Sequence, residues 1–137
     1  MNPQSRIAVA GEALIDLIGQ IDGCFKPCLG GAPYNLSRAL ARQGVRTLFL
    51  NPFSSDRFGR ALVEQLEKDG VLLAHTHPVQ APTSLAVVNL NDQGHPGYAF
   101  YRQGVADRQI DALKLSPLCQ RHNTLQVVCT GALALDP

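Results

Sequence analysis

Short apolar runs and helix-like segments alternate along this chain. The runs 7–10, 47–50 and 126–130 are almost continuously apolar, and each is followed by a glycine or a polar residue. Such runs are typical of strands that are buried on both faces of a parallel sheet. A short apolar run at 71–74 has the same character. We therefore predict three or four sheet strands of this kind.

The first predicted helix lies between the first two of these strands. It follows the glycine pair 30–31, carries Pro33 in its first turn, where a missing N–H costs little, and stops at Gly44. At helical spacing, its inward face is expected to consist of Leu36, Ala39 and Leu40.

A second helix is predicted from Asp56, a good capping residue, to about Asp69, where Gly70 ends it. Its inward face is expected to consist of Ala61, Leu62 and Leu66. The segment 110–115 is expected to form only a short helix or turn. These are the only two long helices that the pattern predicts.

Four extended pieces, 13–18, 25–29, 84–90 and 98–101, do not fit the alternation of strand and helix. The last two flank strong turn chemistry at 91–94, which predicts a β-hairpin. We expect these pieces, about 13–29 and 84–102, to form a separate antiparallel flap.

The order strand, helix, strand, helix, strand predicts an α/β layered fold with a parallel sheet, in one domain over 1–137. A parallel sheet needs cover on both faces, and two long helices supply little. The chain also stops soon after the strand at 126–130. We therefore expect it to be the front part of a larger fold.

Charge and composition exclude several functional classes. Of the 137 residues, 45% are hydrophobic and 17% charged, and 12 Lys and Arg against 11 Asp and Glu leave a net charge of +1. A nucleic-acid binder normally carries a basic excess. The apolar runs are far shorter than the ~20 residues of a membrane span, and no signal-peptide pattern precedes the first strand. We expect a cytoplasmic protein that binds neither nucleic acid nor membrane.

The four cysteines are expected to be reduced thiols in the cytosol. Cys24 and Cys28 stand four residues apart, and Cys119 and Cys129 lie far along the chain. No CxxC pair accompanies them, so small buried side chains are a better interpretation than a zinc site.

The glycine pair 30–31 at a helix start is the sharpest local feature. Glycines let a ligand approach the backbone, and the helix start offers free N–H donors. Asp16 interrupts an apolar run, and Asn35 stands in the first turns of the helix. A carboxylate and an amide are good partners for vicinal hydroxyls. The alternatives are a ligand-free turn at the glycines and a solvated aspartate at a strand end.

Three segments together resemble the N-terminal part of the ribokinase-like (PfkB) carbohydrate kinases: GEALID at 11–16, GGAPYNLSRALARQG at 30–44 and DRFG at 56–59. The segment 98–102 with Ala106-Asp107 is most similar to fructokinases, and 2-keto-3-deoxygluconate and aminoimidazole-riboside kinases share similar features. The resemblance covers about 7–137. It implies a ribokinase-like, Rossmann-type layered sheet with a small β lid in place of the flap.

The resemblance also implies a substrate-binding set consisting of Asp16, Gly30, Gly31, Asn35, Tyr101 and Arg102. The carboxylate and the amide would hydrogen-bond sugar hydroxyls, and the glycines would present backbone N–H groups. The arginine, with the tyrosine as a weaker candidate, would reach over the sugar from the lid. In the family the lid often forms the dimer contact, so a homodimer is implied.

The family's second signature, Gly-Ala-Gly-Asp, is not in this sequence, and the nearest string, at 131–136, does not match it. That signature supplies the catalytic aspartate and the anion hole, so we expect no catalytic, cofactor-binding or metal-binding residue here. ATP and Mg²⁺ are implied for the full-length enzyme only. The prediction is the front half of a sugar kinase of fructokinase type, inactive by itself. The alternatives are a non-catalytic sugar-binding or dimerising fragment, another sugar kinase of the family, and an unrelated α/β domain.

Overall fold

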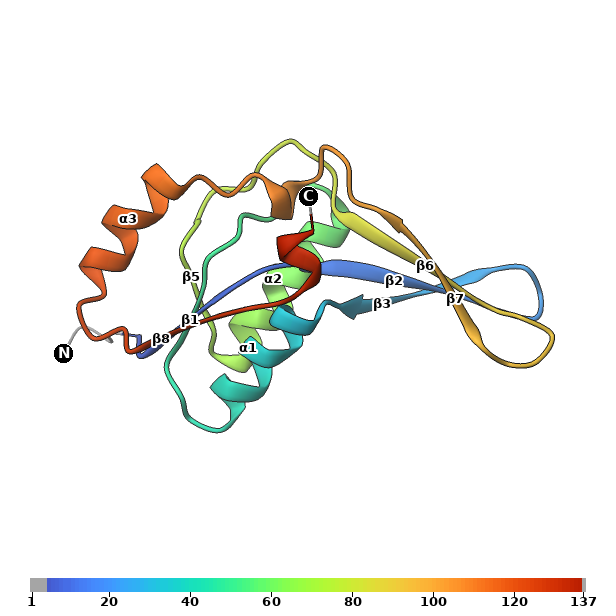
Figure 1. Cartoon of the computed structure of the whole chain (residues 1–137), viewed down its shortest axis with the longest axis horizontal. Coiled ribbons are helices and arrows are strands. Elements are labelled where there is room, and N and C mark those ends of the chain that lie inside the picture. The colour runs from blue at the N-terminus through green and yellow to red at the C-terminus, as the bar shows by residue number, and fades with distance from the viewer. Residues whose placement is uncertain (1–4, 137) are drawn as a thin grey trace.

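Two four-stranded sheets form the framework of the molecule, in a computed structural model that describes residues 5–136 (Figure 1). The first is all parallel in the order β5-β4-β1-β8. Its strands are Leu72–Leu73, Thr47–Phe49, Ile7–Ala10 and Val127–Thr130. The α/β architecture with a parallel sheet is therefore confirmed.

The second sheet has the order β3-β2-β6-β7 and projects away from the body (Figure 1). Its strands are Phe25–Gly30, Leu14–Gly19, Ser84–Leu90 and Pro96–Tyr101. The hairpin β6-β7 is confirmed, but the expectation of a purely antiparallel flap is wrong, because β2 and β6 pair in parallel. Both strands leave the body in the same direction, so side-by-side pairing makes the sheet mixed.

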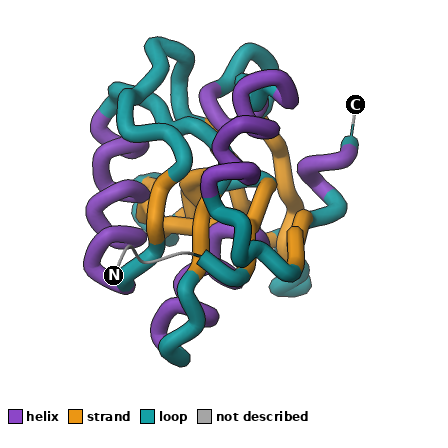
Figure 2. Tube along the Cα trace, turned by 90° about the vertical axis from the view of Figure 1, so that its left-hand side faces the viewer, coloured by secondary structure: helices purple, strands orange, loops and turns teal. Residues whose placement is uncertain are grey.

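Helices cover the two faces of the parallel sheet. Residues of α1 (Ala32–Arg42) and α2 (Arg57–Asp69) join the core cluster built on Val9 and Phe49. Residues of α3 (Ala112–Arg121) join a second cluster built on Ala8 and Leu48. Because side chains alternate along a strand, these clusters lie on opposite faces. Figure 2 shows the helices around the strands.

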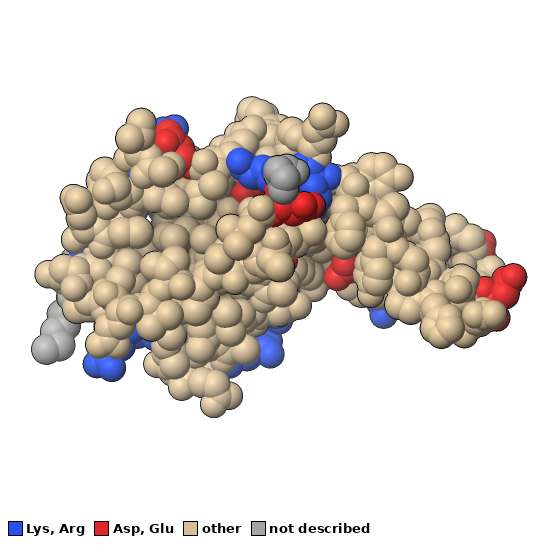
Figure 3. Space-filling model, in the orientation of Figure 1, with Lys and Arg blue, Asp and Glu red and all other residues tan. Residues whose placement is uncertain are grey.

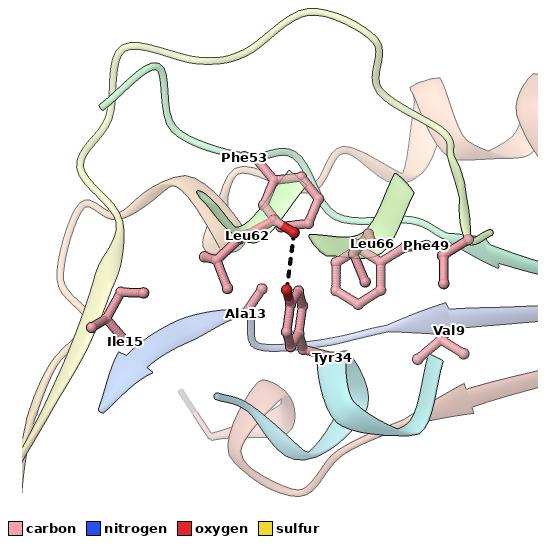
Figure 4. Close-up of a cluster of buried hydrophobic side chains, with 9 residues drawn as sticks. Val9, Ala13, Ile15, Tyr34, Phe49, Phe53, Leu62 and Leu66 are labelled. Carbon is pink, nitrogen blue, oxygen red and sulfur yellow. Dashed lines mark hydrogen bonds between the residues drawn. The ribbon is translucent and has the colours of Figure 1, made fainter. Parts of the chain in front are cut away.

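Tyr34 is the largest fully buried side chain and lies at the centre of the main core (Figure 4). Its ring meets Phe49 edge-on at 6.4 Å between centroids, and its hydroxyl donates a 2.9 Å hydrogen bond to the Leu62 carbonyl oxygen. Burial raises the pKa of Tyr34 to about 12. A phenol can be buried at little cost when its O–H finds such a partner, so this bond joins α1 to α2.

The inward face predicted for α1 is wrong. Pro33, Tyr34 and Ser37 are buried, whereas Leu36 is 40% exposed and Ala39 is also exposed. Of the predicted face only Leu40 packs against the core. The helix can bury this more polar stripe because Ser37 Oγ donates to the Tyr34 carbonyl oxygen at 2.7 Å. In α2, by contrast, Leu62 and Leu66 are buried as predicted, with Ala61 half-buried.

Two predictions near the C-terminus are wrong in part. The strand expected at 126–130 exists as β8, but Val127 and Val128 are 47% and 63% exposed, because β8 is an edge strand of the described sheet. The short helix expected at 110–115 continues as α3 to Arg121, with Pro117 inside it. Proline usually ends a helix, which is why the pattern predicted only a short one.

Asp56 ties the start of α2 to the start of the second sheet. Its Oδ1 accepts hydrogen bonds from Gly59 N and Thr83 Oγ1, both at 2.7 Å, and its Oδ2 accepts one from Thr83 N at 2.8 Å. Burial by itself would raise the pKa of Asp56, but these hydrogen bonds outweigh it and hold the pKa below its ordinary value. The predicted cap therefore also anchors the chain just before β6.

We expect Asp56→Ala to lower the free energy of unfolding by about 2 kcal/mol at pH 7, since it removes a cap and leaves the Thr83 donors unpaired. A carboxylate with a lowered pKa stabilises above its ordinary pKa and loses that effect as the pH falls through the folded value. The deficit should therefore shrink below about pH 4. Urea denaturation at several pH values measures both effects.

Asp111→Ala is the matched control, because Asp111 caps α3 by accepting only from Leu113 N at 2.9 Å. Its loss should cost about 0.5 kcal/mol. Equal costs at the two caps would contradict the anchoring role of Asp56.

Candidate functional site

Asp16 and the glycine pair meet where β2 and β3 pair at the root of the second sheet. Asp16 lies opposite Cys28, and Leu14 lies opposite Gly30. A Cβ atom at position 30 would collide with the Asp16 carboxylate. The missing side chain of Gly30 therefore leaves the space in which the Asp16 carboxylate lies.

Gly31 allows a second close approach. Its φ of 109° lies in the region that favours glycine, and a Cβ atom there would collide with the Glu12 carbonyl group. Gly31 is also the N-cap of α1, and no side chain caps the helix. The N-terminal turn of α1 thus begins next to the strand that carries Asp16.

Asn35 lies in this first turn, where its backbone N–H donates to the Gly31 carbonyl oxygen at 2.9 Å, and the residue is exposed. Within residues 5–136, neither the Asp16 nor the Asn35 side chain makes a hydrogen bond. Burial raises the pKa of the Asp16 carboxyl group. The structure therefore brings Asp16 together with both glycines and places Asn35 one helical turn after them.

Arg102 follows β7 and is held at the junction of the two sheets. Its side chain is only 8% exposed, and one terminal nitrogen donates to the Leu133 carbonyl oxygen at 2.7 Å. The other lies 4.0 Å from Asp107 Oδ2, while the buried Nε has no partner among the described residues. An arginine this well buried retains donor capacity that a ligand could use.

Tyr101 is not brought together with Asp16. It pairs with Leu85, whereas Asp16 pairs with Ala86, and neighbouring positions of a strand point to opposite faces. The Tyr101 side chain therefore lies on the other face of the second sheet, and the residue is 61% exposed.

A cavity of about 300 Å³ lies at the carboxyl ends of β1 and β8. Arg102, Asn51 and Thr130 are among the residues that line it. Ligands of open α/β sheets bind outside the carboxyl ends of the parallel strands, and this cavity has that location. A cavity of about 540 Å³ between α2 and β5 is lined by residues such as Phe53, Val63 and Leu73, and by none of the predicted site residues.

The sequence analysis assigned no role to three buried polar residues at this junction: Glu12, Asn51 and Asp107. Asn51 Oδ1 accepts from Gly11 N at 2.7 Å, and its Nδ2 donates to the Asp107 carbonyl oxygen at 2.7 Å. One carboxylate oxygen of Glu12 is buried and has no hydrogen-bond partner within residues 5–136. The signal for Asn51 was present, since an amide that directly follows a buried strand lies at the carboxyl edge of the sheet.

Two negative findings concern the described residues. Over 5–136, no three or more His, Cys, Asp or Glu side chains gather in a way that could hold a metal ion. In the same part of the chain, none of the helices combines the length and the apolar character that crossing a membrane requires.

The sequence of this chain is similar to known proteins over almost its whole length. Residues 4–135 match the family model described as "pfkB family carbohydrate kinase". The chain is 32% identical to a fructokinase of Escherichia coli over 134 residues. The aligned segment covers 97% of this chain and 43% of that fructokinase. The chain thus spans less than half the length of this relative.

Solved structures share the fold. An uncharacterized sugar kinase from Pyrococcus horikoshii matches with a TM-score of 0.77 at 27% identity, over 96% of this chain and 44% of that one. A fructokinase from Vibrio cholerae, solved with fructose, ADP and calcium ion bound, matches with a TM-score of 0.65 at 31% identity, over 81% and 36%.

The fold is thus that of the ribokinase-like sugar kinases, and the matched segment is their N-terminal part. The chain belongs to the pfkB family of carbohydrate kinases.

A half-buried carboxylate with a raised pKa costs stability when it is ionised. Such a group stabilises the fold below its ordinary pKa and loses that effect as the pH rises through the folded value. We therefore expect Asp16→Asn to raise the free energy of unfolding at pH 7 by roughly 0.5 kcal/mol or less. The gain should vanish near pH 3, and urea titrations at the two pH values measure it.

Asp22→Asn is the control, because Asp22 is exposed in the β2–β3 turn and an asparagine can keep its hydrogen bond from Cys24 N. It should leave stability unchanged at both pH values. A stability gain for Asp16→Asn that persists at pH 3 would contradict the role assigned to its charge.

Proposed function

We propose that this chain is the N-terminal, sugar-binding part of an ATP-dependent sugar kinase of fructokinase type. The full reaction transfers the γ-phosphoryl group of ATP to a sugar hydroxyl. The observation that carries the proposal is the Asp16 carboxylate, which lies against Gly30 at the start of α1 without a hydrogen-bond partner in the described chain. The fructokinase relatives favour fructose as the sugar.

Each residue of the site has a proposed role. Asp16 accepts hydrogen bonds from sugar hydroxyls, and Asn35 donates to or accepts from a neighbouring hydroxyl. The backbone N–H groups at Gly30 and Gly31 face the sugar where no side chain intervenes. Arg102 reaches over the substrate from the junction of the two sheets, where the Leu133 carbonyl oxygen and Asp107 hold its side chain. Tyr101 has the weakest support, because it lies on the other face of the second sheet.

These residues bind and orient the sugar. Phosphoryl transfer depends mostly on positioning and on charge stabilisation around the transferred group. ATP and Mg²⁺, when bound to a full-length kinase, supply the phosphoryl group and neutralise its charge. The second signature of the family is not in this sequence, so we assign neither group a site on this chain. We infer that the chain alone does not transfer phosphate.

A chimera tests the proposal. The chain would replace the matching N-terminal part of the E. coli fructokinase, and sugar phosphorylation would be followed in a coupled assay with fructose, 2-keto-3-deoxygluconate and aminoimidazole riboside. We expect turnover with fructose and, for Asp16→Asn, a loss of at least about 100-fold in kcat/KM.

Asp22→Asn should leave the activity of the chimera unchanged. A folded chimera that phosphorylates none of the sugars, or an Asp16→Asn variant as active as the parent, would overturn the proposal. ATP-dependent turnover by the 137-residue chain alone would overturn the inference that it is inactive.

A dimerising role is the second candidate, favoured by the exposed apolar side chains of the second sheet. Tyr98 and Phe100 stack with ring centroids 6.0 Å apart and are 59% and 50% exposed. Leu90, on the same face of this sheet, is 66% exposed. Apolar side chains gathered in this way mark protein interfaces, and the proposed partner is a second copy of the chain.

We expect Tyr98→Asp combined with Phe100→Ser to convert a dimer into a monomer at micromolar concentration, measured by sedimentation equilibrium. Ile21→Ser is the control, since Ile21 is fully exposed in the β2–β3 turn. If the parent chain is a monomer across the concentration range, the dimerising role is excluded.

A further inference from the structure

The buried carboxylate of Asp107 contacts three strands of the second sheet at the ends that lie beside the parallel sheet. Asp107 lies in the short helix η1 (Ala106–Arg108), and its side chain is 3% exposed. Its Oδ1 accepts from Ser84 Oγ at 2.6 Å, and its Oδ2 accepts from Ala13 N at 3.2 Å. Ser84 is the first residue of β6, and Ala13 directly precedes β2.

The third strand is β7. Arg102 directly follows this strand, and its guanidinium lies 4.0 Å from Asp107 Oδ2. Figure 3 shows side chains of both charges gathered beside the C-terminal end of the described chain, close to where the second sheet leaves the body. The carboxylate therefore compensates a buried positive charge as well as two hydrogen-bond donors.

The backbone of Asp107 connects the same point to the parallel sheet. Its carbonyl oxygen accepts from Asn51 Nδ2, and Asn51 Oδ1 accepts from Gly11 N, both at 2.7 Å. Gly11 follows β1, and Asn51 lies just beyond β4. A continuous set of hydrogen bonds thus runs from the parallel sheet through Asp107 to the second sheet.

We propose that Asp107 is a positioning residue that fixes the second sheet relative to the parallel sheet, and so holds Asp16 beside Gly30 and Arg102 at the junction of the two sheets. The sheet geometry rests on the contacts above. Only the consequence for sugar binding rests on the proposed function.

The buried positive charge of Arg102 favours a carboxylate at this position. Asparagine has nearly the same size, but its NH₂ group would face either the Ser84 hydroxyl or the Ala13 N–H. The Ser84 hydroxyl can reverse the direction of its hydrogen bond and accept from the NH₂ group. The Ala13 N–H can only donate, so an NH₂ group that faces it leaves two donors without an acceptor. Asparagine also leaves the buried Arg102 charge uncompensated, and unpaired buried groups are costly.

Hydrogen exchange of the 137-residue chain, followed by mass spectrometry, tests the geometric part. In Asp107→Asn we expect amides of β2 and β6 to exchange at least about tenfold faster relative to those of β1 and β4, because the roots of the second sheet open locally. Asp136→Asn is the control, since Asp136 is exposed near the same junction. Uniform acceleration in all four strands, or none, would overturn the proposal.

Ser84→Ala provides a milder perturbation and a coupling test. It should accelerate exchange in β6 less than Asp107→Asn does. In the double variant the acceleration should be smaller than the product of the two single effects, since both substitutions act on the same Ser84–Asp107 contact. If Asp107→Asn does not fold, this variant alone should still accelerate exchange in β6 selectively. Strictly multiplicative effects, or no effect of Ser84→Ala, would overturn the proposal.

The fructokinase chimera tests the consequence for the site. Asp107→Asn should raise the KM for the sugar at least about tenfold and leave the KM for ATP within about twofold, because only the sugar-binding side chains move. Equal changes in both would indicate a general structural role and overturn the proposal. An inactive parent chimera would refute the proposed function, while the exchange experiment would still decide the role of Asp107.

Discussion

The backbone that enters α1 passes Asp16 and the Glu12 carbonyl group so closely that positions 30 and 31 have no room for a side chain. This close packing sets the geometry of the site. It lets α1 start directly against β2, and it leaves the Asp16 carboxylate beside bare backbone. Any larger residue in the pair would have to push the helix away from the strand or displace the carboxylate. The proposed sugar contacts all depend on this packing.

Buried polar groups and apolar contacts together form the junction of the two sheets, since Ile15 of β2 is fully buried in the core around Tyr34. Asn51 and Asp107 satisfy backbone donors at the ends of β1 and at the start of β2, and Asp56 does the same at the starts of α2 and β6. Such networks specify one arrangement because each partner must be in place for the others to be satisfied. The apolar core around Tyr34 includes the start of β2 as well as the parallel sheet and its helices, and we propose that these hydrogen bonds set the direction of the second sheet.

Family membership and the partial length of the match bear on different questions. The match to the pfkB model and the shared fold establish what kind of framework this is. The chain covers 43% of the E. coli fructokinase, and we propose that the residues it contributes bind and orient a polyol. The exposed edge strand β8 and the exposed side chains of α3 are features of this chain as it stands. We propose that this part of the fold binds the sugar and that the remainder of a full-length kinase supplies the groups for phosphoryl transfer.

Interactions between residues close in the chain determine many elements of this structure, and the sequence alone was enough to predict them. The glycine pair predicted the start of α1, Asp56 and Gly70 predicted the ends of α2, and the apolar runs predicted the parallel strands. Each of these signals lies within a few residues of the element it defines. The tertiary structure decided the rest. Tyr34, and not the predicted Leu36, lies in the core because its hydroxyl donates to the Leu62 carbonyl oxygen, 28 positions away. Asp107 became the junction through a backbone N–H 94 positions away. Hydrogen bonds between such distant positions leave no periodic trace in the chain, so only the folded arrangement could reveal them.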